Sequence, residues 1–231
     1  MKTKTRFAWK QFLKNLAIIA IPVALQNMLT TTGSMIDTMM IAPLGETTVG
    51  AVGLCAQFSS LMFAGYWGFF GGGMLFFSQY WGAQDDDGID RSYGLTLTCM
   101  MIVGLTFGAF AIFAPETVMK LYTDKESIQV IGAEYLRIIG FGYPVQVFSM
   151  AMSALLRSTE RVRIPLFASI ASVASNIFLN WVFIYGKFGL PEMGVRGAAC
   201  ATLIARCVEL IIVIWFLKYR ENVLNLNLRK L

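Results

Sequence analysis

Long segments without a charged side chain are the feature that most constrains the fold of this 231-residue sequence. Five uncharged runs cover residues 15–36, 47–84, 92–115, 138–156 and 164–186. A sixth apolar segment, 197–217, contains only two charged residues, Arg206 and Glu209. A helix needs about 20 apolar residues to cross a bilayer core about 30 Å thick. The sequence therefore predicts an all-α membrane protein, a bundle of six transmembrane helices.

The composition excludes a soluble globular enzyme. Hydrophobic residues make up 56% of the chain and charged residues only 14%, whereas soluble domains carry about 25% charged residues. The sequence contains no histidine, which removes Ser-His-Asp and Cys-His nucleophiles and His-ligated zinc. The four cysteines lie inside apolar segments without a C-x-x-C pair, so no disulfide framework is expected. We expect neither enzymatic activity nor an organic cofactor.

The basic residues lie at the ends of the apolar segments, so the net charge of +5 does not indicate a nucleic-acid partner. A single helix over 47–84 places 13 Lys or Arg residues on one side of the membrane and four on the other, whereas two helices there give nine against eight. The positive-inside rule favours the single helix. We therefore expect a multi-pass plasma-membrane protein, in contact with lipid, with both termini in the cytoplasm.

The charges also set the expected boundaries. We expect a basic N-terminal segment over 1–14 and a tail or the start of a linker over 219–231. Between them, over 15–218, the six helices are expected at about 15–40, 47–81, 92–114, 128–157, 164–186 and 194–218. Residues 117–128 are expected to form a short interfacial helix. The glycine pairs Gly68/Gly72 and Gly104/Gly108 predict close packing between helices.

Asp37 is the clearest candidate for a functional residue, because it ends the first span with no charged partner near it in the sequence. An ionisable side chain inside a membrane costs about 2.5–3.5 kcal/mol on insertion scales and is a functional hypothesis by default. One interpretation is a hydrated aspartate at the outer end of the first helix. The other is a carboxylate in an internal cavity that exchanges a proton or holds Na+.

Two asparagines on the fifth span form a second candidate group. Asn176 and Asn180 are four residues apart and therefore share one helix face. Their carboxamide oxygens suit a hard cation or a hydrogen-bonding substrate. Hydrogen bonding between helices is the alternative.

Other polar residues within the spans suggest a substrate cavity and structural pairs. Pro144 should kink its helix, and Tyr143 and Gln146 beside it are candidate cavity residues, together with Gln26 and Asn27 in the first span. Arg206 and Glu209 are three residues apart, and so are Glu134 and Arg137. We expect the two residues of each pair to form an ion pair with each other and so to neutralise their charges.

Several stretches of the sequence resemble the multidrug and toxic compound extrusion (MATE) family. They are Ile36-Asp37-Thr38, Pro43-Leu44-Gly45, Gly82-Ala83-Gln84-Asp85, Arg157-Ser158-Thr159, and Asn176-Ile177-Phe178-Leu179-Asn180 followed by residues 186–202. Each stretch alone is weak. Their order and spacing along the chain carry the resemblance.

The resemblance implies the first six-helix lobe of a two-lobe (6+6) bacterial antiporter that expels organic, often cationic, compounds by alternating access. It places Asp37, Asn176, Asn180 and Thr202 in one cation site, with Na+ or H+ as the coupling ion and Na+ possible at Asp37, Asn176 and Asn180. One branch of the family has aspartate at position 180, so Asn180 puts a two-carboxylate proton relay in doubt.

The likeness covers one lobe only. It implies that the chain is a fragment or pairs with another six-helix lobe. A lipid-linked oligosaccharide flippase of the same superfamily and a non-transporting structural subunit are the alternatives.

Overall fold

The computed structural model describes residues 9–219, apart from the side chains of Asn15 and Tyr219. Its helices are α1 (Trp9–Ile41), α2 (Glu46–Ala83), α3 (Asp86–Phe113), α4 (Pro115–Tyr122), α5 (Glu126–Ile139), α6 (Gly142–Ser158), α7 (Arg163–Ile184) and α8 (Gly194–Tyr219), with short 3-10 helices at Ala42–Leu44 (η1) and Lys187–Gly189 (η2). Residues 1–8 of the expected N-terminal segment and residues 220–231 of the expected tail lie outside the described part of the chain.

The helical pattern gives up to six membrane spans. Within the described residues, α1, α2, α3, α7 and α8 are each long and apolar enough to cross a membrane. Helices α5 and α6 meet this condition only together, as a pair bent by 52°. Counting that pair as one broken span gives six, so the predicted fold class is confirmed.

Two expected helix boundaries are wrong by several residues. Helix α1 begins at Trp9 rather than 15, and α3 begins at Asp86 rather than 92. The Asp85 side chain caps α3 by accepting a hydrogen bond of 2.9 Å from the Gly88 N–H. Charged residues mark where the apolar span ends, but α3 continues past them to its capped N-terminus. In contrast, α2 is one continuous helix of 38 residues, as the charge distribution predicts.

Two further features differ from the sequence prediction: the position of the short helix between α3 and α5, and a break in the fourth span. The short helix there is α4, Pro115–Tyr122, whereas 117–128 was expected. The span expected over 128–157 is interrupted between Ile139 and Gly142. Pro144 explains the interruption, because it has no N–H to donate to the Gly140 carbonyl and its ring would clash with that carbonyl in a straight helix.

Glycines let α3 approach the α5–α6 bend closely. A Cβ atom on Gly104 would lie 2.7 Å from a Val147 methyl carbon, and one on Gly108 would lie 3.1 Å from the Gly140 carbonyl oxygen. Both glycines are buried, so the prediction for this pair is confirmed. The prediction for Gly68 and Gly72 is wrong, because a Cβ atom at either position would meet no described atom within 4 Å.

Replacing Gly104 with alanine is expected to lower the free energy of unfolding by about 1–3 kcal/mol. The new methyl group would overlap Val147, whose branched side chain has few rotamers. Gly68→Ala is the matched control, and it should be neutral or stabilising because alanine favours helices. The thermal unfolding of both variants in detergent measures the difference. Equal melting temperatures would contradict close packing at Gly104.

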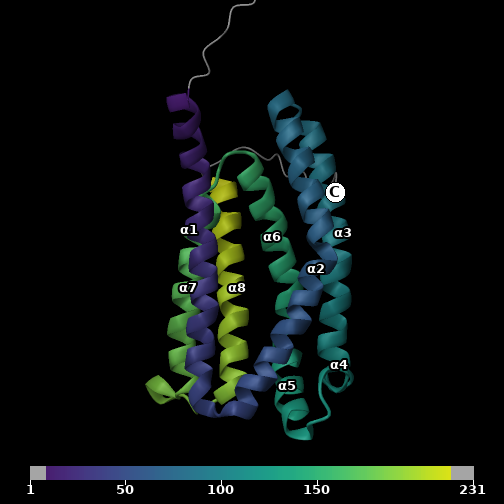
Figure 1. Cartoon of the computed structure of the whole chain (residues 1–231), viewed down its shortest axis with the longest axis vertical. Helices are drawn as coiled ribbons and strands as arrows, with labels where there is room; N and C mark the ends of the chain where they lie inside the picture. The colour runs from purple at the N-terminus through teal and green to yellow at the C-terminus, as the bar shows by residue number, and fades with distance from the viewer. Residues whose placement is uncertain (1–8, 220–231) are drawn as a thin grey trace, which may run out of the picture.

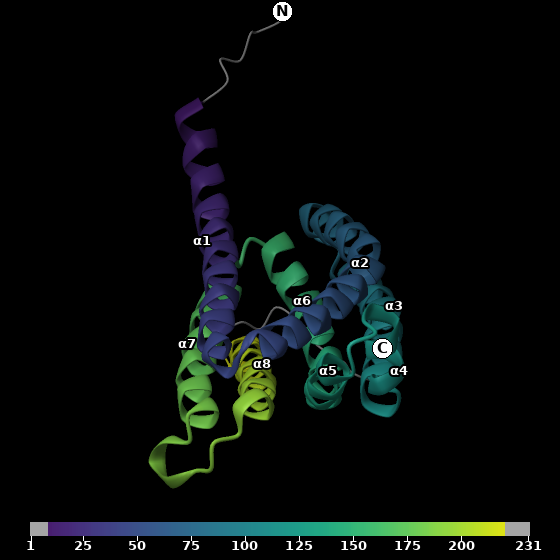
Figure 2. The same cartoon turned by 60° about the horizontal axis from the view of Figure 1, so that its bottom comes forward.

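The helices form two groups joined through α5 and α6 (Figures 1 and 2). Helices α1, α7 and α8 lie side by side in one group, with α7 in contact with both α1 and α8. Helices α2 and α3 pack together in the other group. Helices α5 and α6 each contact α2, α3 and α8, so both connect the groups.

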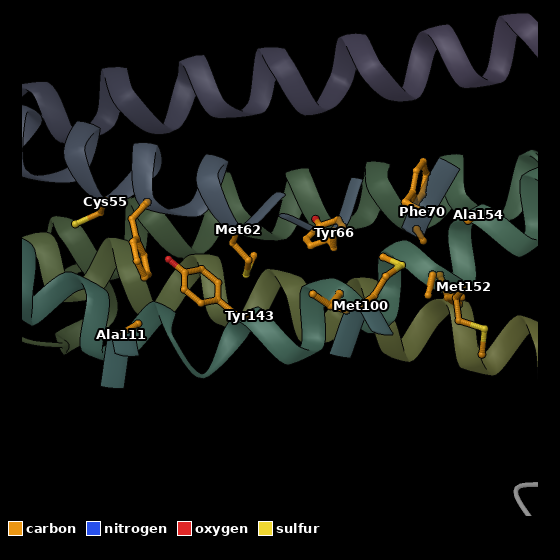
Figure 3. Packing of buried hydrophobic residues seen from close by; sticks show 14 of the residues in the cluster. Cys55, Met62, Tyr66, Phe70, Met100, Ala111, Tyr143, Met152 and Ala154 are labelled. Carbon is orange, nitrogen blue, oxygen red and sulfur yellow. The ribbon is translucent and has the colours of Figure 1, made fainter. Parts of the chain in front are cut away.

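The largest part of the buried core lies between α2, α3 and α6. Helix α2 turns a stripe at three- and four-residue spacing inward, and this stripe includes Cys55, Met62, Tyr66 and Phe70 (Figure 3). Tyr143 on α6 is buried beside this stripe, and its hydroxyl lies 2.9 Å from the Ser59 hydroxyl. The core holds α2 and α6 in place, whereas polar residues gather in the other helix group.

Candidate cation site

Asp37, Asn176, Asn180 and Thr202 lie together where α1, α7 and α8 meet. The Asn180 side-chain Nδ2 donates to Asp37 Oδ1 at 2.5 Å and to Asn176 Oδ1 at 3.2 Å. Asn176 Nδ2 in turn donates to Thr202 Oγ1 at 3.3 Å. The structure therefore links all four residues that the family resemblance groups, over a sequence separation of 143 residues between Asp37 and Asn180.

Close contact between α1 and α7 brings Asp37 to Asn180. One turn before Asp37, a Cβ atom on Gly33 would lie 3.2 Å from the Val173 methyl carbons, so a larger side chain would push the helices apart. After Asp37, the Tyr185 hydroxyl donates to the Met40 carbonyl at 3.0 Å. These contacts fix α1 against α7 on both sides of the carboxylate.

One buried oxygen in this group has no hydrogen-bond donor among the described residues. Asn180 is fully buried, and its Oδ1 atom accepts no hydrogen bond there. An unsatisfied buried acceptor is costly, by about 1–3 kcal/mol. A cation or a hydrogen-bond donor within reach of this oxygen would satisfy it.

The oxygen atoms around Asp37 suit a hard cation as ligands. The carboxylate, the two carboxamide oxygens and the Thr202 hydroxyl are all oxygen ligands, which Na+ and similar ions prefer. Within residues 9–219, no group of three or more His, Cys, Asp or Glu side chains gathers. The residue types present therefore fit an alkali cation or a proton better than a transition metal.

A cavity of about 170 Å³ opens beside this group. Its lining includes Asp37 and Ser34 from α1, Asn176 from α7 and Thr202 from α8. The remaining lining residues are Thr30, Gly33, Ser169, Ser172, Val173, Ala205, Arg206 and Glu209.

The four predicted substrate residues do not line this cavity. Gln26 is buried; it donates to Ser169 Oγ and accepts from Arg157 Nη2, both at 2.8 Å. Tyr143 belongs to the buried core, Asn27 is exposed and Gln146 is half-buried. The sequence shows that these residues lie in apolar spans, but it does not show which face of each span lines a cavity.

One of the two predicted ion pairs forms. Arg206 and Glu209 approach to 3.9 Å, as their spacing predicts. The prediction of a Glu134–Arg137 pair is wrong, because Glu134 forms an ion pair with Arg196 at 2.6 Å. The other half of the expected pair, Arg137, binds Glu116, also at 2.6 Å. Partners on neighbouring helices here give shorter contacts than the residue one turn away.

Sequence reasoning missed the position of Arg206 and Glu209 on the cavity wall. They follow Thr202 at four and seven residues, so the three residues share one face of α8. That spacing was a usable signal once Thr202 was assigned to the cavity.

Comparison with known proteins gives one family. The family model described as MatE matches residues 22–182. The chain is 25% identical over 215 residues to the probable multidrug resistance protein YoeA of Bacillus subtilis, covering 93% of this chain and 46% of that protein. It is 23% identical to the multidrug resistance protein NorM of Vibrio cholerae, covering 90% of this chain and 46% of NorM. The chain spans about half the length of the curated relatives it matches.

Solved structures show the same fold. A MATE crystal structure in the bent conformation matches with a TM-score of 0.83 at 24% identity, covering 94% of this chain and 48% of that one. The outward-facing structure of a MATE multidrug resistance transporter matches with a TM-score of 0.82, again at 24% identity, covering 94% of this chain and 48% of that one. The described helices are therefore arranged as in one half of these transporters.

Proposed function

Because this chain belongs to the MatE family, we propose that it forms one lobe of an antiporter that exports organic, often cationic, compounds in exchange for Na+ or H+. The second lobe is a further six-helix unit, either continuous with this chain or on a partner chain. The half-length match to relatives supports the second lobe. The names of YoeA and NorM support multidrug resistance as the activity.

The observation that carries this proposal is the unsatisfied Asn180 oxygen beside Asp37. A bound Na+ or H+ supplies the positive charge that neutralises the Asp37 carboxylate. Asp37, Asn176 and Asn180 hold the cation through their side-chain oxygens, and Thr202 positions Asn176 by accepting its N–H. The Asn180 N–H donates to the Asp37 carboxylate and orients it.

The cation acts on transport by favouring one arrangement of the lobe. Asp37 on α1 is bonded to Asn180 on α7, which is linked through Asn176 to Thr202 on α8, so a change at Asp37 alters how α1 packs on α7 and reaches α8 through the two asparagines. A ligand shifts a conformational equilibrium only as far as its affinities for the two states differ. Loading and release of the cation thus alternate the side from which substrate has access.

Substrate binds against the exposed polar part of the lobe rather than in its core. Asn27 is exposed and Gln146 is half-buried, which leaves both able to contact a ligand. Gln26 and Tyr143 already hold hydrogen bonds inside the lobe, so they position helices instead. Organic cations are the proposed substrate class.

The proposal places the protein in a bacterial cell membrane with both termini in the cytoplasm. The support is the distribution of Lys and Arg between the spans. The named relatives are bacterial proteins.

The test is efflux of ethidium, a cationic dye, from proteoliposomes that contain the protein as expressed from its own gene. An imposed Na+ or H+ gradient should accelerate efflux above the rate with no gradient. Equal rates with and without either gradient would contradict cation coupling.

A further inference from the structure

Helix α8 presents two charged residues to the cavity that contains Asp37. Arg206 and Glu209 line it together with Thr202, all on one face of α8. Thr202 belongs to the hydrogen-bonded group around Asp37. Arg206 and Glu209 have no part in that group, yet they share its cavity.

The Arg206–Glu209 contact is looser than the Arg137–Glu116 and Arg196–Glu134 contacts. Its nitrogen–oxygen distance is 3.9 Å, against 2.6 Å for both Arg137–Glu116 and Arg196–Glu134. The Arg206 side chain is 40% exposed, whereas the Glu209 side chain is only 14% exposed. The Arg206 side chain is therefore the more exposed of the two, and its contact with Glu209 is long.

Glu209 is held in place by its surroundings. The Ser169 hydroxyl donates to Glu209 Oε1 at 3.4 Å. Ser169 in turn accepts from Gln26, which is bound to Arg157. Arg157 also acts electrostatically on Glu209. Glu209 is thus a fixed anion at one end of the cavity, and Arg206 is the adjacent cation with more freedom.

Arg206 also acts electrostatically on Asp37. Asp37, Arg206 and Glu209 are the charged residues among those that line the cavity, which has a volume of about 170 Å³. In a space this small, partly screened from water, a guanidinium group and a second cation repel each other strongly. Arginine does not lose its charge, so this repulsion persists at every working pH.

We infer that Arg206 is a tethered cation that competes with the coupling cation for Asp37, with Glu209 as its alternative partner. The inference rests on the proposed cation-coupled function. In the empty lobe, Arg206 turns toward Asp37 and compensates its charge. When a cation occupies Asp37, repulsion drives Arg206 toward Glu209, which lies 3.9 Å from it. Arg206 is therefore a positioning residue that sets how tightly the lobe holds its coupling cation.

The inference predicts shifts of opposite sign for the two partners. Arg206→Gln removes the competitor, so the cation concentration that gives half-maximal efflux should fall on the order of tenfold. Glu209→Gln removes the alternative partner of Arg206, so the same concentration should rise on the order of tenfold. Arg206→Lys keeps the charge and should stay near the wild-type value. Loss of a merely structural ion pair would move both glutamine variants in the same direction.

The measurement is ethidium accumulation in everted vesicles of cells that express the full gene, because an exporter in an everted membrane carries its substrate into the lumen. Na+ is titrated at fixed pH, and pH is titrated at fixed Na+. An unchanged or raised half-activating concentration in Arg206→Gln overturns the inference. If Arg206→Gln does not fold, Arg206→Met keeps the packing of the stem. If neither variant folds, Glu209→Gln alone decides by the sign of its shift.

Asp37→Asn separates failure of the inference from failure of the proposed function. If Asp37→Asn abolishes cation-driven efflux but Arg206→Gln shifts nothing, only the role of Arg206 is wrong. If Asp37→Asn retains cation-driven efflux, or the wild type shows none, then the proposed function fails and the inference fails with it.

Discussion

Replacing Asp37 with asparagine is expected to reduce cation-driven efflux to the rate of vesicles without the protein. Asparagine has nearly the same shape, so the contact with Asn180 can persist, but it carries no negative charge and takes up no proton. The cation would then lose the carboxylate that holds it. Ethidium efflux from proteoliposomes under an imposed Na+ or H+ gradient measures the loss.

The matched control for this substitution is Asp124→Asn. Asp124 is exposed in the loop between α4 and α5, so its charge lies outside the helices. We expect this variant to transport as the wild type does. Full cation-driven efflux in Asp37→Asn would exclude Asp37 from coupling and would favour the interpretation of Asp37 as an interfacial aspartate.

Replacing Asn180 with leucine is expected to have the second largest effect. The variant loses the N–H that donates to Asp37 and to Asn176, and it loses the buried oxygen proposed to face the cation. A charged group that loses a buried hydrogen-bond partner costs about 1–3 kcal/mol or more. We therefore expect cation-driven efflux to fall roughly ten- to hundredfold, since 1.4 kcal/mol is a factor of ten. The melting temperature in detergent should fall as well.

Asn180→Asp distinguishes loss of oxygen ligands from loss of packing. Aspartate keeps the side-chain oxygen, replaces the NH2 group by a second oxygen and adds a charge, as in one branch of the family. We expect cation-driven efflux to persist, with a lower half-activating cation concentration than in the wild type. Equal loss in Asn180→Asp and Asn180→Leu would show that the N–H of Asn180, rather than its oxygen, is the essential group.

Local spacing was enough to find part of the candidate site. Asn176 and Asn180 share a face because any two helical residues four apart do so, and their bond confirms that geometry. Asp37 stood out because a lone carboxylate in an apolar segment is costly. Neither argument could show that Asp37 meets Asn180, because α1 and α7 are far apart in sequence. Only the family resemblance joined them before the structure did.

The ion pairs show where local spacing fails. Glu134 and Arg137 are one turn apart, yet Glu134 binds Arg196 on α8 and Arg137 binds Glu116 on α4. Arg196 offers two nitrogens to Glu134, at 2.6 and 3.0 Å, which a neighbour on the same helix seldom matches. The partner of a charged side chain therefore depends on which helices pack together.

The sequence alone determined that this chain crosses a membrane through about six apolar helices, that α2 is one long helix, and that Asp37 is the exceptional charge of the first span. These results follow from the length of each apolar segment and from the free-energy cost of a charged side chain inside the membrane. Both are properties of a single segment and need no knowledge of its neighbours. Tertiary structure decided that Asp37 meets Asn180, that the span after α4 breaks ahead of Pro144, and that Arg206 faces the cavity of Asp37. Those outcomes depend on which helix faces pack together, and small residues such as Gly33 and Gly104 set that packing by how closely they let two helices approach.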